Sequence, residues 1–117
     1  MEFVYNLLLV LHFVGLAALL GGFIVQMSSP DKGVNAAMLH GALTQLVTGV
    51  LMVGILEAGL LPDETANMPK ITAKLAIVVI ITVLAFIGRR RTPPQVGLWG
   101  VIGVLTLTNV VIAVFWN

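Results

Sequence analysis

The chain has 117 residues, of which 59% are hydrophobic and 9% are charged, and its formal net charge is +1. Soluble domains carry far more charge, so this composition excludes an ordinary water-soluble fold and indicates an integral membrane protein. The small net charge excludes the broad basic surface of a nucleic-acid-binding protein. The absence of cysteine excludes disulfides and a cysteine-ligated iron–sulfur cluster. We therefore expect membrane lipids, and not nucleic acid, as partners.

Four apolar stretches are long enough to cross a membrane, because a helix needs about 20 residues to span a hydrocarbon core about 30 Å thick. They cover residues 3–27, 35–56, 71–88 and 96–116. The sequence therefore predicts an all-α fold, a single integral membrane four-helix bundle with short loops over residues 1–117. Glu2 stands where a secretory signal would carry a basic residue, and His12 interrupts the apolar run, so we expect the first helix to be retained.

The connections between the helices predict the topology. Turn-forming residues at 28–33 predict a tight antiparallel hairpin, residues 62–69 carry the acidic charge, and residues 89–94 hold three of the six basic residues. An excess of arginine next to a membrane helix marks the cytoplasmic side. We therefore predict a multi-pass protein of the plasma membrane with both termini on the outer side. The rings expected at the interfaces are Tyr5 and Trp116 on the outer side and Trp99 on the inner side.

Small and polar residues recur at three- and four-residue spacing on three of the helices, and such stripes bring membrane helices together. The first stripe holds His12, Gly15, Leu19, Gly22 and Gln26. The second holds Gly41, Gln45, Thr48 and Met52, with His40 and Thr44 adjacent, and the stripe of the fourth helix holds Gly103, Thr106, Asn109 and Ala113. We expect these three faces to meet.

The two histidines are candidates for cofactor binding, because an ionisable side chain inside a membrane is costly and usually functional. His12 is either a ligand or a neutral imidazole that is hydrogen-bonded to a partner such as Asn109. His40 either binds haem or a metal or bonds to the backbone of the first connection. Their predicted depths differ by roughly 13 Å, which disfavours one haem held by both within one subunit. A haem with one histidine and another ligand, or one at a subunit interface, stays open, as does copper.

Other polar residues inside the predicted helices are Gln45, Thr48, Lys74 and Asn109. Lys74 either extends its ammonium towards the interface or forms an ion pair with Glu57 at the end of the second helix. The sequence shows no nucleophile–base pair, paired carboxylates or phosphate-binding loop. We therefore expect a non-enzymatic protein more than an enzyme.

Two short segments carry a resemblance to a known group. The run Leu11-His12-Phe13-Val14-Gly15, followed by Leu20-Gly21-Gly22, resembles the first helix of small bacterial membrane proteins related to the copper-resistance D group. Lys74-Leu75 and the run up to Arg89-Arg90-Arg91 resemble a later helix of that group, and the whole chain is similar to short actinobacterial four-helix membrane proteins. The resemblance implies a bundle that handles copper or haem, with His12 as the matched residue and His40 unmatched.

Three functions follow as expectations from these observations. The first is a non-enzymatic accessory or structural subunit of a homo-oligomer or a larger membrane complex, because short loops and helix-packing surface make up almost the whole chain. The alternative is a haem- or copper-binding membrane protein that uses an intramembrane histidine. The third is a small transporter, which would need to oligomerise to enclose a path.

Overall fold

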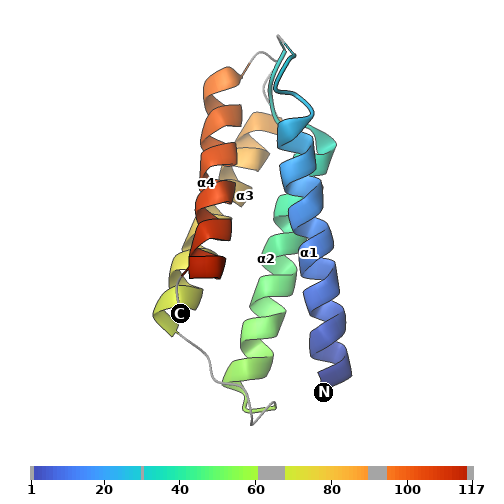
Figure 1. Ribbon diagram of the computed structural model, residues 1–117, viewed down its shortest axis with the longest axis vertical. Helices are drawn as coiled ribbons and strands as arrows, with labels where there is room; N and C mark the ends of the chain where they lie inside the picture. Colours follow the sequence, from blue (N-terminus) through green and yellow to red (C-terminus); the bar gives the residue numbers. More distant parts are fainter. Residues whose placement is uncertain (1, 30, 61–67, 90–94, 116–117) are drawn as a thin grey trace.

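The computed structural model describes residues 2–29, 31–60, 68–89 and 95–115, and these residues form four helices. They are α1 (Glu2–Ile24), α2 (Ala36–Glu57), α3 (Met68–Arg89) and α4 (Val96–Phe115), shown in Figure 1. The all-α prediction is confirmed. All four helices are long and apolar enough to cross a membrane.

Two helix ends differ from the predicted bounds by three residues, and the other ends agree to within one residue. α1 ends at Ile24 instead of residue 27, because Gln26 and Met27 donate their amides to carbonyls only three residues back and so tighten the last turn. α3 begins at Met68, three residues before the predicted start. The sequence placed Pro69 in the loop, but a proline fits the first turn of a helix, where its missing amide would have no partner.

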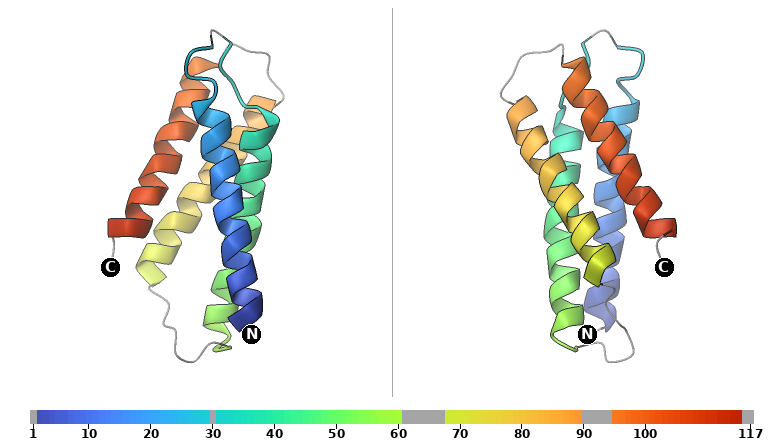
Figure 2. Two further views of the ribbon diagram at one scale, coloured as in Figure 1. Left: turned by 45° about the vertical axis from the view of Figure 1, so that its right-hand side comes forward. Right: turned by 90° about the vertical axis from the view of Figure 1, so that its left-hand side faces the viewer.

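The helices run up and down in chain order, and each packs against the next one (Figures 1 and 2). α1 and α2 form the closest pair, whereas α1 and α4 touch only sparsely. The start of α1, the end of α2, the start of α3 and the end of α4 lie at one end of the bundle, which we call the N-terminal end. Both views in Figure 2 show α4 diverging from α1 towards this end.

The side of the membrane that each end faces stays a prediction. Arg89 is exposed at the end of α3, away from the N-terminal end. The other two arginines of the basic run, most of the acidic loop and Trp116 lie outside the described residues.

Glycines allow the close contact between α1 and α2. A Cβ atom on Gly41 would lie 2.5 Å from the amide nitrogen of Leu19 and 2.7 Å from the carbonyl oxygen of Gly15, so no side chain fits there. A Cβ atom on Gly15 would lie 2.8 Å from the side chain of Thr44. The stripes predicted on these two helices do meet. The stripe on α4 is only partly buried, because Ala113 near the end of that helix is exposed.

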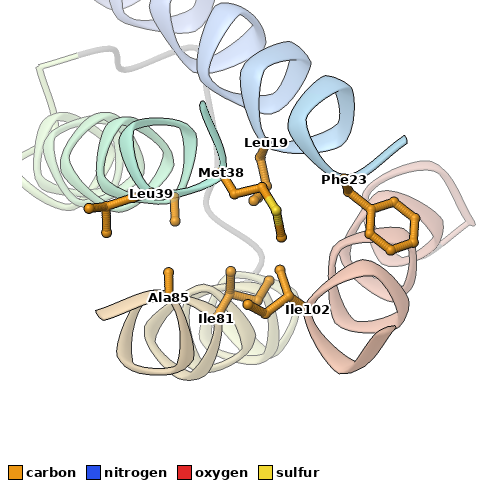
Figure 3. Close-up of a cluster of buried hydrophobic side chains, with 8 residues drawn as sticks. Leu19, Phe23, Met38, Leu39, Ile81, Ala85 and Ile102 are labelled. Carbon is orange, nitrogen blue, oxygen red and sulfur yellow. The ribbon is translucent and has the colours of Figure 1, made fainter. Parts of the chain in front are cut away.

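The hydrophobic core occupies the half of the bundle away from the N-terminal end. Figure 3 shows Leu19 of α1 and Met38 of α2 pointing towards Ile81 of α3 and Ile102 of α4, and none of these four side chains is more than 2% exposed. Core residues from all four helices therefore close this half.

A hydrogen-bond network around Asn35 fixes the α1–α2 connection at the end of the bundle opposite the N-terminal end, which we call the closed end. Asn35 caps α2, because its Oδ1 accepts from the amide of Met38 at 2.9 Å, while its Nδ2 donates to the carbonyl of Gly22 at 3.1 Å. Gln26 donates to the same carbonyl at 2.9 Å and accepts from the amide of Gly33 at 2.9 Å. This network satisfies backbone groups that the ends of the two helices would otherwise leave unpaired.

Trp99 joins α4 to the same end of α1. Its ring stacks on Phe23 with the centroids 4.4 Å apart, and its Nε1 donates to the Phe23 carbonyl at 2.9 Å. The ammonium of Lys32 lies 5.4 Å from the centre of the Trp99 ring, within range of a cation–π interaction. The ring expected at an interface thus also holds two helices together.

The α1–α2 contact predicts the effect of two alanine substitutions. Gly41→Ala places a methyl group against the backbone of α1 and should lower the free energy of unfolding by about 1–3 kcal/mol. Gly21→Ala is the matched control, since a Cβ there meets nothing within 4 Å and should change stability by less than about 1 kcal/mol. Unfolding in detergent, followed by tryptophan fluorescence, measures both; equal stability of the two variants would contradict the close contact.

Candidate functional site

A cleft opens between the helices in the N-terminal half of the bundle. Its volume is about 140 Å³, and its lining is mostly apolar. Tyr5, Leu56 and Ile71, which lie near the helix ends, line it at the mouth, whereas His12 and Gln45 line it deep inside. His12 is ten residues from the start of α1, so the cleft extends about 15 Å into the bundle. Each helix contributes one of the side chains that could bind a ligand, namely His12, Gln45, Lys74 and Asn109.

The hydrogen bonds of His12 determine its tautomer. Its Nδ1 lies 2.7 Å from Oγ1 of Thr48, and this hydroxyl donates its single proton to the carbonyl of Thr44 at 2.6 Å. His12 must therefore be the donor, which leaves Nε2 with a free lone pair. The side-chain amide of Gln45 donates to the His12 carbonyl and joins the two helices a second time.

The hydrogen-bond partner expected for His12 was wrong. The side chain of Asn109 bonds elsewhere, and Thr48 takes its place. The chain does contain a signal for this pair. His12 precedes the last residue of α1 by twelve positions, and Thr48 follows the first residue of α2 by twelve, so an antiparallel hairpin brings them to one depth.

Lys74 on α3 points its cationic chain into the same cleft, where it is half-buried. Its ammonium has no hydrogen bond or ion pair in the part of the chain that the structure describes, and no carboxylate lines the cleft there. The ion pair with Glu57, one of the two alternatives for Lys74, is not formed between these residues, and Glu57 is exposed at the end of α2. Lys70, one turn nearer the mouth, donates to the Ala113 carbonyl at 3.2 Å and ties α3 to α4.

Asn109 carries a second uncompensated group. Its Nδ2 donates to the Lys74 carbonyl at 3.3 Å, and its Oδ1 is buried with no partner among the described residues. Exchanging the two amide atoms would set oxygen against oxygen, so this orientation is the favourable one. A neighbouring cavity of about 20 Å³ is lined by Asn109, Gln45 and Thr106, and it is large enough for one water molecule.

His40 takes no part in the cleft. It is exposed on the outer surface of α2 and makes no hydrogen bond to the described residues of the first connection. It lies eight residues from Thr48, which corresponds to about 12 Å along the helix axis. The two histidines are therefore not brought together, and the described segments contain no group of three or more histidine, cysteine or acidic side chains that could hold a metal ion.

Tyr5 was expected at the membrane interface, and its place in the cleft was missed. It is half-buried and lines the mouth of the cleft. No signal in the sequence separates these two positions, because both place a tyrosine one turn inside a helix end.

Comparison of the chain with protein-family models, with curated proteins and with solved structures found no match.

The arrangement suits binding better than catalysis. A threonine nucleophile needs a base that accepts its proton, but His12 donates to Thr48, and the proton of Thr48 points at a backbone carbonyl. The cleft instead offers a cationic donor at Lys74 and an acceptor at His12 Nε2. These groups can hold a ligand without reacting with it.

The hydrogen bond to Thr48 predicts a difference between two threonine substitutions. Thr48→Val leaves the Nδ1–H of His12 unpaired and should lower the free energy of unfolding by about 1–3 kcal/mol. Thr108→Val removes an exposed hydroxyl that bonds only within its own helix, so it should change stability by less than about 0.5 kcal/mol. Unfolding in detergent measures the stabilities, and ¹⁵N NMR of the imidazole reports the tautomer. A neutral His12 protonated at Nε2 in the native protein would contradict the assignment.

Proposed function

We propose that the chain is a non-enzymatic binding protein embedded in a membrane, and that its cleft takes one small ligand or the polar part of a larger one. One observation carries this proposal. Each of the four helices contributes at least one polar side chain to a single cleft of a mostly apolar bundle. Convergence of this kind in a concave site is the usual mark of a ligand pocket.

The uncompensated groups strengthen the proposal. Inside a bilayer a polar group without a partner is costly, so a bundle that only packs would be expected to pair its polar side chains internally. The ammonium of Lys74 and the Oδ1 of Asn109 have no such partner in the described part of the chain. A ligand bound in the cleft would supply the partner that Lys74 lacks.

The size of the cleft limits the ligand. Pockets that enclose a drug-sized molecule have volumes of about 300–1,000 Å³. At about 140 Å³ the cleft holds a head group or a small molecule, and the much larger porphyrin ring of haem would enter only if the helices moved apart. We therefore rank haem below a small polar group.

Copper is a second candidate, favoured by one pair of residues. His12 and Met52 line the same cleft from adjacent helices, and imidazole and thioether ligands both suit reduced copper. The nearby ammonium of Lys74 would repel a bound cation, so we place copper second. The resemblance to copper-resistance D proteins stays a prediction.

The role of accessory subunit is compatible with binding but has less support. Large apolar side chains are exposed on all four helices, as expected for contact with lipid, so no single face stands out as an interface with a partner subunit.

A substitution that fills the cleft tests the proposal. Met52→Trp puts a large ring into the cleft, whereas Val50→Trp on the same helix adds the same ring at an exposed position. We expect native mass spectrometry of protein extracted in nanodiscs to detect one retained ligand in the native chain and in Val50→Trp, and none in Met52→Trp. Visible spectra and metal analysis of the same samples identify haem or copper.

Two results would overturn the proposal. One is a native protein that retains no small molecule. The other is a ligand that stays equally bound in Met52→Trp. Either result would favour the accessory-subunit reading.

A further inference from the structure

The groups in the cleft specify the chemistry of their ligand. We propose that it is an anionic phospholipid whose head group carries hydroxyl groups beside the phosphate, as in phosphatidylglycerol. This inference rests on the proposed function and names the ligand class of the same site.

The charge of Lys74 calls for an anion. Its Cα atom lies about 9 Å from the start of α3, inside the apolar span, and no carboxylate of the described chain lines the cleft with it. A cation in low dielectric is stabilised by an opposite charge at close range. A phosphodiester supplies one negative charge, which matches the one cation that lines the cleft among the described residues.

The free acceptor of His12 calls for a hydrogen-bond donor. Its Nε2 has a lone pair without a partner in the described structure, and a phosphodiester has only acceptor oxygens. Such a head group would satisfy Lys74 and leave Nε2 unpaired. A hydroxyl group next to the phosphate can donate to Nε2, so a polyol head group fits both positions, whereas a choline head group brings a second cation and no donor.

The surroundings of the cleft favour a lipid over a soluble phosphate. The cleft lies between helices that are apolar enough to span a membrane. Large apolar side chains are exposed at positions deeper along the bundle than Lys74, namely Val10 and Val14 on α1 and Val104 and Leu107 on α4. Acyl chains, which extend from a head group towards the middle of the bilayer, can pack against such a surface while the head group enters the cleft.

The test compares four ligands that differ in one feature each. Phosphatidylglycerol has the charge and the hydroxyls, phosphatidylmethanol has the charge alone, phosphatidylcholine is zwitterionic without hydroxyls, and sn-glycerol 3-phosphate lacks the acyl chains. Binding to the purified full chain is titrated by native mass spectrometry. We expect phosphatidylglycerol to bind at least about tenfold more tightly than phosphatidylcholine, and phosphatidylmethanol to be intermediate.

Two variants that each remove one positive charge test whether the selectivity for phosphatidylglycerol arises in the cleft. Lys74→Met should weaken the binding of phosphatidylglycerol at least about tenfold. Arg89→Gln, which removes one positive charge at the opposite end of the bundle, should leave its affinity within about twofold. Lys74→Met removes a charge that has no partner in the described part of the chain, so we expect it to fold, and the comparison of lipids on the native chain does not depend on it.

The outcomes separate the two claims. Equal binding of phosphatidylglycerol and phosphatidylcholine, both blocked by Met52→Trp, would overturn the lipid class and leave the proposed function standing. Equal binding of phosphatidylmethanol and phosphatidylglycerol would overturn the role of the hydroxyls, and glycerol 3-phosphate binding as tightly as the lipid would make the ligand soluble. If no ligand is blocked by Met52→Trp, the proposed function itself fails.

Discussion

Helices surrounded by lipid gain little from hiding apolar side chains, so they associate where their backbones can approach closely. In this chain the closest approach is between α1 and α2, where Gly41 leaves no room for a Cβ atom against Leu19 and Gly15. The contact fixes the register of the hairpin. It thereby places His12 opposite Thr48, and the hydroxyl of Thr48 in turn decides which imidazole nitrogen stays free.

The two ends of the bundle differ in their packing. At the closed end the hydrogen-bond network around Asn35 and the stacking of Trp99 on Phe23 hold α1, α2 and α4 together, and the core lies beneath them. Towards the N-terminal end α4 diverges from α1 (Figure 2), and this half of the bundle holds the cleft. Core packing is therefore concentrated in one half, whereas Lys74 and the Oδ1 of Asn109, which lack partners in the described part of the chain, lie in the other. Such a division is expected where a binding site costs stability.

Much of the fold could be predicted from the sequence, because length and hydropathy alone specify helices that can cross a membrane. The stripes on α1 and α2 were also predictable, since small residues three and four positions apart must share a face. Burial was less predictable. His40 and Gly41 are neighbours in the chain, but they point about 100° apart on a helix, so one faces outward while the other is buried.

The site was predicted only in part for a similar reason. Gln45, Lys74 and Asn109 were candidates by polarity and depth, and they do share a cleft with His12. The sequence could not show that Lys74 faces inward instead of reaching Glu57, because that depends on how α3 is rotated against its neighbours. Rotation in a bundle is set by contacts with neighbouring helices, and a single hydropathy profile does not contain them.

The central claim is that a cleft lined by a few polar side chains enters the bundle from one end while the outer surface faces lipid. Leu75 lines the cleft, and Ala76, its neighbour at the same depth, is exposed on the outer surface of α3. Because the chain has no cysteine, Leu75→Cys and Ala76→Cys each introduce a single thiol. In nanodiscs, a small charged thiosulfonate reagent should modify Leu75→Cys at least about tenfold faster, because only a hydrated thiol ionises and reacts readily. Equal rates, or faster modification of Ala76→Cys, would contradict the cleft.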